Sequence, residues 1–130
     1  MSLRAISTEN AAPPMSRYSQ AIEVKADCDL LYLSGQVGAF PDGTMAEGEE
    51  AQHEQVWANI LAILVEADMG PADIVEITAY VTASSGVPLY REVRDRVLDG
   101  AEPASTLIIA AGLAHPSWLV ELSIVAAKRR

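Results

Sequence analysis

One amphipathic segment, between Glu47 and Gly70, constrains the fold more than any other part of this chain. Its apolar residues recur at i, i+3, i+4 and i+7, which is the spacing of one face of an α-helix. They are Val56, Trp57, Ile60, Leu61, Ile63, Leu64 and Ala67. Gly70 followed by Pro71 predicts where this helix ends. A helix with so wide an apolar face has to cover a second apolar layer.

The segments on both sides of this helix have the composition of β-strands. Residues 74–82 are rich in β-branched and aromatic residues and predict a central strand. Further strands are expected over residues 3–6, 18–24, 30–34 and 106–111, with a last one around Glu121. We expect the strands at 18–24 and 30–34 to pair across a turn, and the last two strands to form a closing hairpin. Such a hairpin would bring Ser105, Thr106 and Glu121 together at one end.

A second helix is predicted between Ser85 and Gly100. Tyr90, Val93 and Val97 have the spacing of its buried stripe. Its charged residues are assigned to the solvent-facing side, with Arg91 and Asp95 at the spacing of an ion pair; they are Arg91, Arg94, Asp95 and Arg96. Two helices on one face of a mixed β-sheet make a single α+β domain over residues 1–130.

The charge of the chain excludes several classes of partner. Nine basic and eighteen acidic residues give a net charge of −9, which repels nucleic acid and anionic membrane surfaces. The basic cluster at residues 128–130 is interpreted as a solvated chain end. No apolar run reaches the roughly 18 residues of a membrane span. Because Cys28 is the only cysteine, no internal disulfide is possible, and we predict a cytoplasmic protein.

No metal or cofactor is expected from the motifs. The chain has two histidines, His53 and His115, whereas a zinc site usually takes three or four ligands. Phosphate-binding and dinucleotide-binding glycine patterns are missing from the sequence. Glu121 stands alone among apolar neighbours. It lies either on the polar side of an alternating strand or in a partly desolvated place suited to proton transfer.

Several short motifs, spread over nearly the whole chain, resemble the RidA/YjgF family of reactive-intermediate (enamine/imine) deaminases. Residues 7–11 (STENA) resemble the family's T-E-N-A-P, residues 17–20 (RYSQ) its G-P-Y-S-Q, and residues 33–37 (LSGQV) its S-G-Q strand end. Residues 59–64 (NILAIL) resemble the family's long helix, residues 103–106 (PAST) its P-A-R-S/T, and residues 120–122 (VEL) the V/I-E-I of its last strand.

The resemblance implies a chorismate-mutase-like α+β fold that assembles as a homotrimer, with small-molecule clefts between subunits. It implies that Tyr18, Ser34 and Gly35 line the cleft and that Glu121 positions or activates the water that hydrolyses an imine. The ligand would be a 2-imino or 2-oxo acid or a related metabolite, and the reaction would be a hydrolytic deamination.

One departure from the family pattern bears on the substrate. Where the family carries an arginine that grips the substrate carboxylate, this chain has Ser105, followed by Thr106. A serine hydroxyl lacks the charge and the bidentate fork of a guanidinium. Arg17 and Arg91 are the candidates to supply the missing charge. Two functions therefore stay open: a deaminase with altered substrate choice, or a non-catalytic, regulatory trimer that binds a small ligand.

Overall fold

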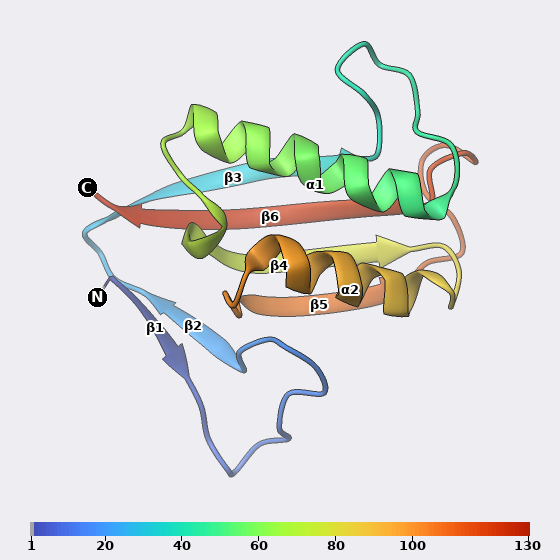
Figure 1. Cartoon of the computed structure of the whole chain (residues 1–130). Helices are drawn as coiled ribbons and strands as arrows, with labels where there is room; N and C mark the ends of the chain where they lie inside the picture. Colours follow the sequence, from blue (N-terminus) through green and yellow to red (C-terminus); the bar gives the residue numbers. More distant parts are fainter. Residues whose placement is uncertain (1) are drawn as a thin grey trace.

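The computed structural model describes residues 2–130, which form one α+β domain (Figure 1). Its elements in chain order are β1 (Leu3–Ile6), β2 (Ala21–Val24), β3 (Cys28–Val37), α1 (Glu49–Glu66), the 3₁₀ helix η1 (Pro71–Asp73), β4 (Ile74–Val81), α2 (Gly86–Leu98), β5 (Ala104–Ile109) and β6 (Val120–Arg129). Both helices cover the same face of the larger sheet, so the predicted fold class is confirmed.

The larger sheet has four strands in the order β3-β6-β4-β5. β6 runs antiparallel to both of its neighbours, whereas β4 and β5 are parallel and are joined through α2. A parallel pair needs such a crossover, and the helix of the crossover packs back on the sheet. β1 and β2 form a separate two-stranded antiparallel sheet.

The predicted strand pairing was wrong in two places. β2 pairs with β1 instead of β3, and β3 pairs with β6. β4 lies between β5 and β6, so the closing hairpin does not form. The connection at residues 110–119 is longer than the roughly two to five residues of a tight hairpin, and it carries the chain across the end of β4.

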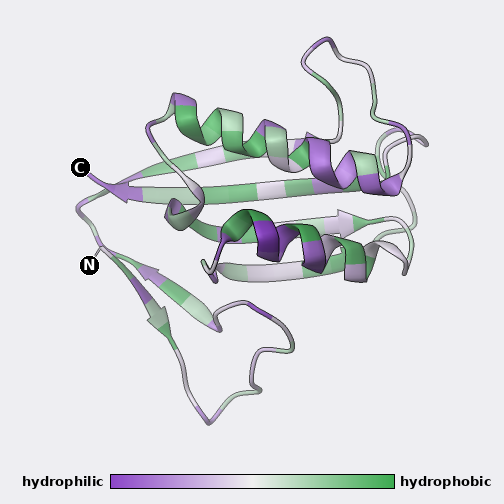
Figure 2. Ribbon diagram, viewed as in Figure 1, coloured by the Kyte–Doolittle hydropathy of each residue, from purple (hydrophilic) through white to green (hydrophobic). Residues whose placement is uncertain are grey.

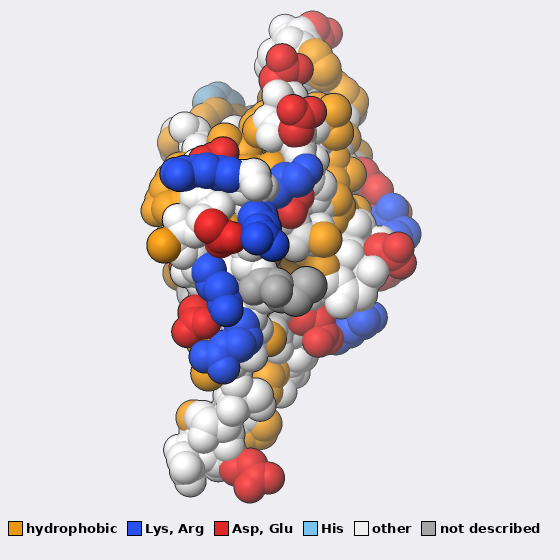
Figure 3. All heavy atoms as spheres, turned by 90° about the vertical axis from the view of Figure 1, so that its left-hand side faces the viewer, with side chains coloured by type: hydrophobic (Ala, Val, Ile, Leu, Met, Phe, Trp, Pro, Cys, Tyr) orange, Lys and Arg blue, Asp and Glu red, His pale blue; other side chains and the backbone are white. Residues whose placement is uncertain are grey.

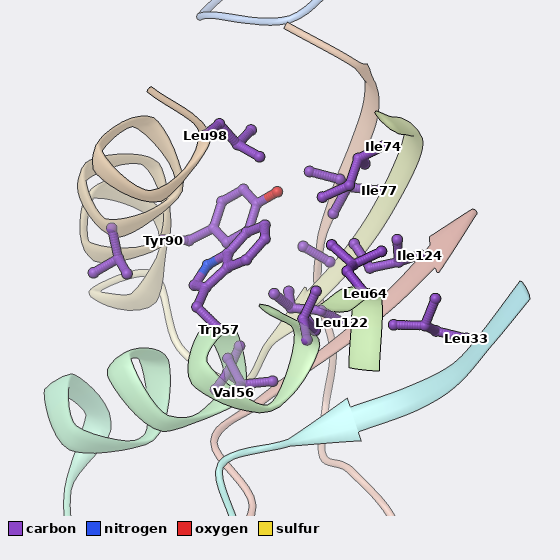
Figure 4. Packing of buried hydrophobic residues seen from close by; sticks show 14 of the residues in the cluster. Leu33, Val56, Trp57, Leu64, Ile74, Ile77, Tyr90, Leu98, Leu122 and Ile124 are labelled. Carbon is purple, nitrogen blue, oxygen red and sulfur yellow. The ribbon is translucent and has the colours of Figure 1, made fainter. Parts of the chain in front are cut away.

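The core lies between the two helices and the sheet, as the apolar stripe of α1 predicts. Trp57, Ile60 and Leu64 of α1 are fully buried, and so is Tyr90 of α2. Figure 4 shows Trp57 and Tyr90 pointing into the layer between the helices and the strands. Hydrophobic residues are frequent on both helices and on the strands that they cover (Figure 2). Burying a large apolar side chain contributes about 1.5–3 kcal/mol, so this layer dominates the stability.

Gln52 joins α1 to the long connection before β6. Its side-chain amide donates to the carbonyl groups of Ala46 (3.1 Å) and Ser117 (2.8 Å). Its side-chain oxygen accepts from the amide of Leu119 at 2.8 Å. Gln52 is 2% exposed, so one buried side chain satisfies three backbone groups outside regular structure.

The chain end at residues 128–130 is not a loose basic tail. β6 extends to Arg129, whose guanidinium pairs with Asp27 at 3.0 Å, and Arg130 pairs with Asp29 at 2.6 Å. Figure 3 shows Lys and Arg side chains gathered among Asp and Glu side chains on the side of the molecule that carries the termini. The predicted solvated end is confirmed, because all three residues are exposed, and Arg129 and Arg130 have acidic partners beside them.

Within residues 2–130, the helices are too short or too polar to cross a membrane.

Candidate functional site

The strand register divides the predicted site residues between the two faces of the larger sheet. Ser105 pairs with Ile77, which is fully buried under the helices, so Ser105 lies on the helix-covered face. Glu121 pairs with Tyr80 of the same central strand. Successive residues of a strand point to opposite faces, so Tyr80 and Ile77 point to different faces. Glu121 therefore lies on the face away from the helices, here called the open face. Ser105 and Glu121 therefore do not converge within one chain, contrary to the hairpin prediction.

A hollow of about 240 Å³ lies on the helix-covered side, at the edge of the sheet. The loop before β2 lines it with Met15, Ser16 and Tyr18, α2 with Arg91 and Arg94, and β5 with Ser105 and Leu107. Three residues predicted for the site, Tyr18, Arg91 and Ser105, thus surround one space. We call this space the arginine hollow, because it is the part of the candidate site that carries positive charge.

Backbone contacts hold the loop of the hollow against the start of β5. The amide of Ser19 donates to the carbonyl of Pro103 at 3.2 Å, and the Ser19 hydroxyl donates to the carbonyl of Glu102. The amide of Met15 donates to the hydroxyl oxygen of Tyr18 at 3.0 Å. Because Tyr18 accepts this bond, its own proton is free to be donated to a ligand.

Arg94 is buried, although the sequence assigned it to the solvent-facing side of α2. It is 2% exposed, its guanidinium carbon lies 5.4 Å from the centre of the Tyr90 ring, and its Nε donates to Asp95 at 2.9 Å. A longer contact, of 3.5 Å, joins Nη2 to the Ser16 hydroxyl. The overlooked signal is the spacing: Arg94 follows the buried Tyr90 by four residues and so shares its helix face. Asp95 therefore pairs with Arg94, and the predicted Arg91–Asp95 pair is wrong.

The Tyr90 hydroxyl is a buried polar group behind the wall of this hollow that the sequence did not reveal. Tyr90 is fully buried, and its Oη has no hydrogen-bond partner among residues 2–130. Burial raises the pKa of Tyr90, and the neighbouring Ser105 and Arg94, both on the wall of the hollow, partly oppose that rise in pKa. The phenol therefore stays protonated and is a potential donor.

The two candidates for the missing charge differ in position. Arg91 lines the hollow, and no acidic side chain of residues 2–130 forms an ion pair with it. Arg17 lies outside the lining and pairs with Glu102 at 3.7 Å. Arg91 is therefore the better placed of the two.

Gly35 and Glu121 lie against each other on the open face. The β3–β6 register shifts between Leu33 and Gln36, which forms a bulge at Ser34 and Gly35. A Cβ atom on Gly35 would lie 2.2 Å from Oε2 of Glu121, so only glycine leaves room for this carboxylate. The Ser34 carbonyl accepts a bond from Gln36 at 3.1 Å. Thr106 is exposed on this face, beside Thr78 of β4.

Metal chemistry has no evident site in the described residues. Among residues 2–130, no group of three or more His, Cys, Asp and Glu side chains is arranged to hold an ion. His53 is buried in α1, and burial lowers its pKa, while Glu49 and Glu54 partly oppose that lowering. Neither of its ring nitrogens has a partner in this part of the chain.

Comparison with known proteins identifies close relatives of the chain. A family model described as endoribonuclease L-PSP matches residues 8–128. A RutC family protein of Aquifex aeolicus is 41% identical over 81 residues, which cover 62% of each chain. A RutC family protein of Pyrococcus abyssi is 30% identical over 130 residues, covering 98% of this chain and 99% of the relative.

Solved structures agree with these matches. A Rid family protein from Yersinia pestis, YyfB, is 29% identical with a TM-score of 0.86, covering 98% of this chain and 100% of that one. RidA from an Antarctic Psychrobacter is 31% identical with a TM-score of 0.73, covering 96% of this chain and 99% of that one. Sequence and fold therefore point to the same group of proteins.

Proposed function

Because this chain belongs to the RidA/YjgF family, we propose that it forms a homotrimer with small-metabolite clefts between subunits. The separation of the arginine hollow from Glu121 supports this proposal. The two groups lie on opposite faces of one sheet, so a site that uses both takes them from different subunits. The exposed apolar side chains of Leu30 and Tyr32, on the open face, give such an assembly a surface to bury.

The proposed reaction is the hydrolytic deamination of a reactive enamine or imine. Water attacks the carbon of the C=N bond, and Glu121 transfers one proton of that water to the nitrogen, which gives a carbinolamine. The second proton then passes from the carbinolamine hydroxyl to the nitrogen, the C–N bond breaks, and ammonia leaves as the carbonyl product forms. The chemistry consumes only water, so it needs no cofactor. Thr106 and Ser34 remain proposed as contacts of the ligand on the Glu121 side of the cleft.

The observation that carries this proposal is the packing of the Glu121 carboxylate over Gly35. The carboxylate lies on the open face, against a stretch of backbone that has no side chain. The described residues offer it no ion pair, so its oxygens are free to accept from water.

The test is the Glu121→Gln variant, which keeps the shape of the side chain and removes its basicity. With any imine that the wild type hydrolyses, we expect the rate to fall by about 10²- to 10⁴-fold. Imines generated from small amino acids, such as 2-iminobutanoate and 2-iminopropanoate, are the first substrates to assay. Unchanged hydrolysis by a folded, trimeric Glu121→Gln protein would refute the water-positioning role.

A second candidate function is that of a non-catalytic ligand-binding trimer, which Ser105 favours. An enzyme of the family's usual kind needs a cation at that position, whereas a binding protein for another ligand does not. Saturable binding of a small acid without turnover of any imine would support this function. RNA cleavage, which the name of the family model suggests, is disfavoured by the net charge of −9.

A further inference from the structure

We propose that Arg91 and Arg94 of α2 together bind the carboxylate of a small organic acid in the arginine hollow. This inference rests on the proposed function only in taking the hollow as part of the ligand site. It assigns the anion-binding role to the helix above the sheet instead of to residue 105 on the strand.

The charges around the hollow suit a ligand with one negative charge. Two guanidinium groups line it, and one of them, Arg94, is already paired with Asp95 at 2.9 Å. Arg91 has no acidic partner among residues 2–130, so one positive charge remains uncompensated. A carboxylate matches that single charge, whereas a phosphate dianion would leave an excess negative charge in a chain of net charge −9.

Hydrogen-bond donors are available beyond the two cations. Arg94 has five N–H donors, and contacts to Asp95 and Ser16 engage only two of them. Tyr18 keeps its proton for a ligand because Met15 donates to its oxygen. The Tyr90 hydroxyl is fully buried behind the wall of the hollow, next to Ser105 and Arg94, and does not itself line the hollow.

Ser105 fits this arrangement because it is small and uncharged. It lies on the wall of the hollow together with Arg91 and Arg94. An arginine at position 105 would add a third cation to a space of about 240 Å³ and would fill much of it. The serine therefore leaves room for the ligand and adds one more hydroxyl.

The experiment measures binding of 2-oxobutanoate to the purified full-length chain by calorimetry. Its methyl ester tests the need for charge, and inorganic phosphate tests the choice of anion. The variants are Arg91→Ala, the double variant Arg91→Ala/Ser105→Arg, and Arg96→Ala as the matched control. Arg96 lies on the same helix but pairs with Glu54, outside the hollow. Arg91 is exposed, so its replacement by alanine leaves the core intact.

We expect Arg91→Ala to weaken binding at least about 10-fold, since a charge-assisted hydrogen bond is lost. Arg96→Ala should bind as the wild type does, and the double variant should regain most of the affinity, because residues 91 and 105 face the same space. For the buried position, Arg94→Lys keeps the charge but loses the fork and the contact with the Tyr90 ring, and should weaken binding in protein that circular dichroism shows to be folded.

Several results would overturn the inference: wild-type affinity in Arg91→Ala, equal binding of the ester, stronger binding of phosphate, or no binding of 2-oxobutanoate to the wild type. The proposed function fails separately. If Arg91→Ala loses binding while Glu121→Gln hydrolyses imines at the wild-type rate, the inference about the anion site is supported and the role of Glu121 is refuted. The reverse pattern would refute the anion site alone.

Discussion

Gly35 matters because it has no side chain. A Cβ atom at this position would approach Oε2 of Glu121 to 2.2 Å, so Gly35→Ala should turn the carboxylate away from its place on the open face. We expect imine hydrolysis to fall by about 10²-fold, the usual cost of a displacement of about 1 Å, with little change in the fold. The matched control is Gly112→Ala, since nothing lies within 4 Å of a Cβ atom there. Equal rates in the two variants would contradict the positioning role of Gly35.

His53 should make the stability of the protein sensitive to mild acid. Burial lowers its pKa in the folded chain, whereas the unfolded chain keeps a pKa near 6.5. Below that pH, His53 binds a proton in the unfolded state but not in the folded state. The free energy of unfolding therefore falls as the pH falls, by up to about 1.4 kcal/mol per pH unit. Urea denaturation between pH 7.5 and about 5 should show this slope, and His53→Leu should remove it.

The control for this titration is His115→Gln, because His115 is an exposed loop residue whose ring accepts from the Ser117 amide at 3.1 Å. We expect this variant to retain the slope. A slope that persists in His53→Leu would show that other groups cause the loss of stability in acid.

The attachment of α1 to the loop before β6 depends on one side chain. Replacing Gln52 with leucine would leave three backbone groups without this partner, namely the carbonyls of Ala46 and Ser117 and the amide of Leu119. We expect a loss of about 2–4 kcal/mol in the free energy of unfolding, measured by urea denaturation at one subunit concentration. Gln55→Leu, on the same helix, removes only a bond to Asn59 and should cost less than about 1 kcal/mol. Similar losses in both variants would contradict this account.

The elements of the fold were predictable from the sequence, whereas their pairing was not. The helices and strands follow from local periodicity, although α1 ends at Glu66, before the predicted stop at Gly70. Which strands become neighbours depends on contacts far apart in the chain, and the insertion of β4 between β5 and β6 has no local signal. The same limit applies to the site. Tyr18, Ser105 and Arg91 were expected from the sequence. The burial of Arg94 depends on how α2 packs, and the separation of Ser105 from Glu121 depends on the strand register.

The assembly itself can be tested on the open face. Tyr32 on β3 is 71% exposed in the single chain, so a charge there would be buried by the proposed trimer. We expect Tyr32→Glu to shift sedimentation from trimer to monomer. Val65 on α1 is 69% exposed on the helical side, and Val65→Glu should remain trimeric. A wild-type protein that sediments as a monomer, or a Tyr32→Glu variant that stays trimeric, would contradict this interface.

The opposite placement of Ser105 and Glu121 on one sheet also has a consequence for inheritance. A chain that is damaged near α2 still offers an intact carboxylate, and a chain that lacks the carboxylate still offers intact arginines. When two such chains are produced in the same cell and assemble at random, about a quarter of the clefts in the proposed trimer combine intact arginines from one chain with an intact carboxylate from the other. Two defective alleles can therefore complement each other, although neither chain would work alone.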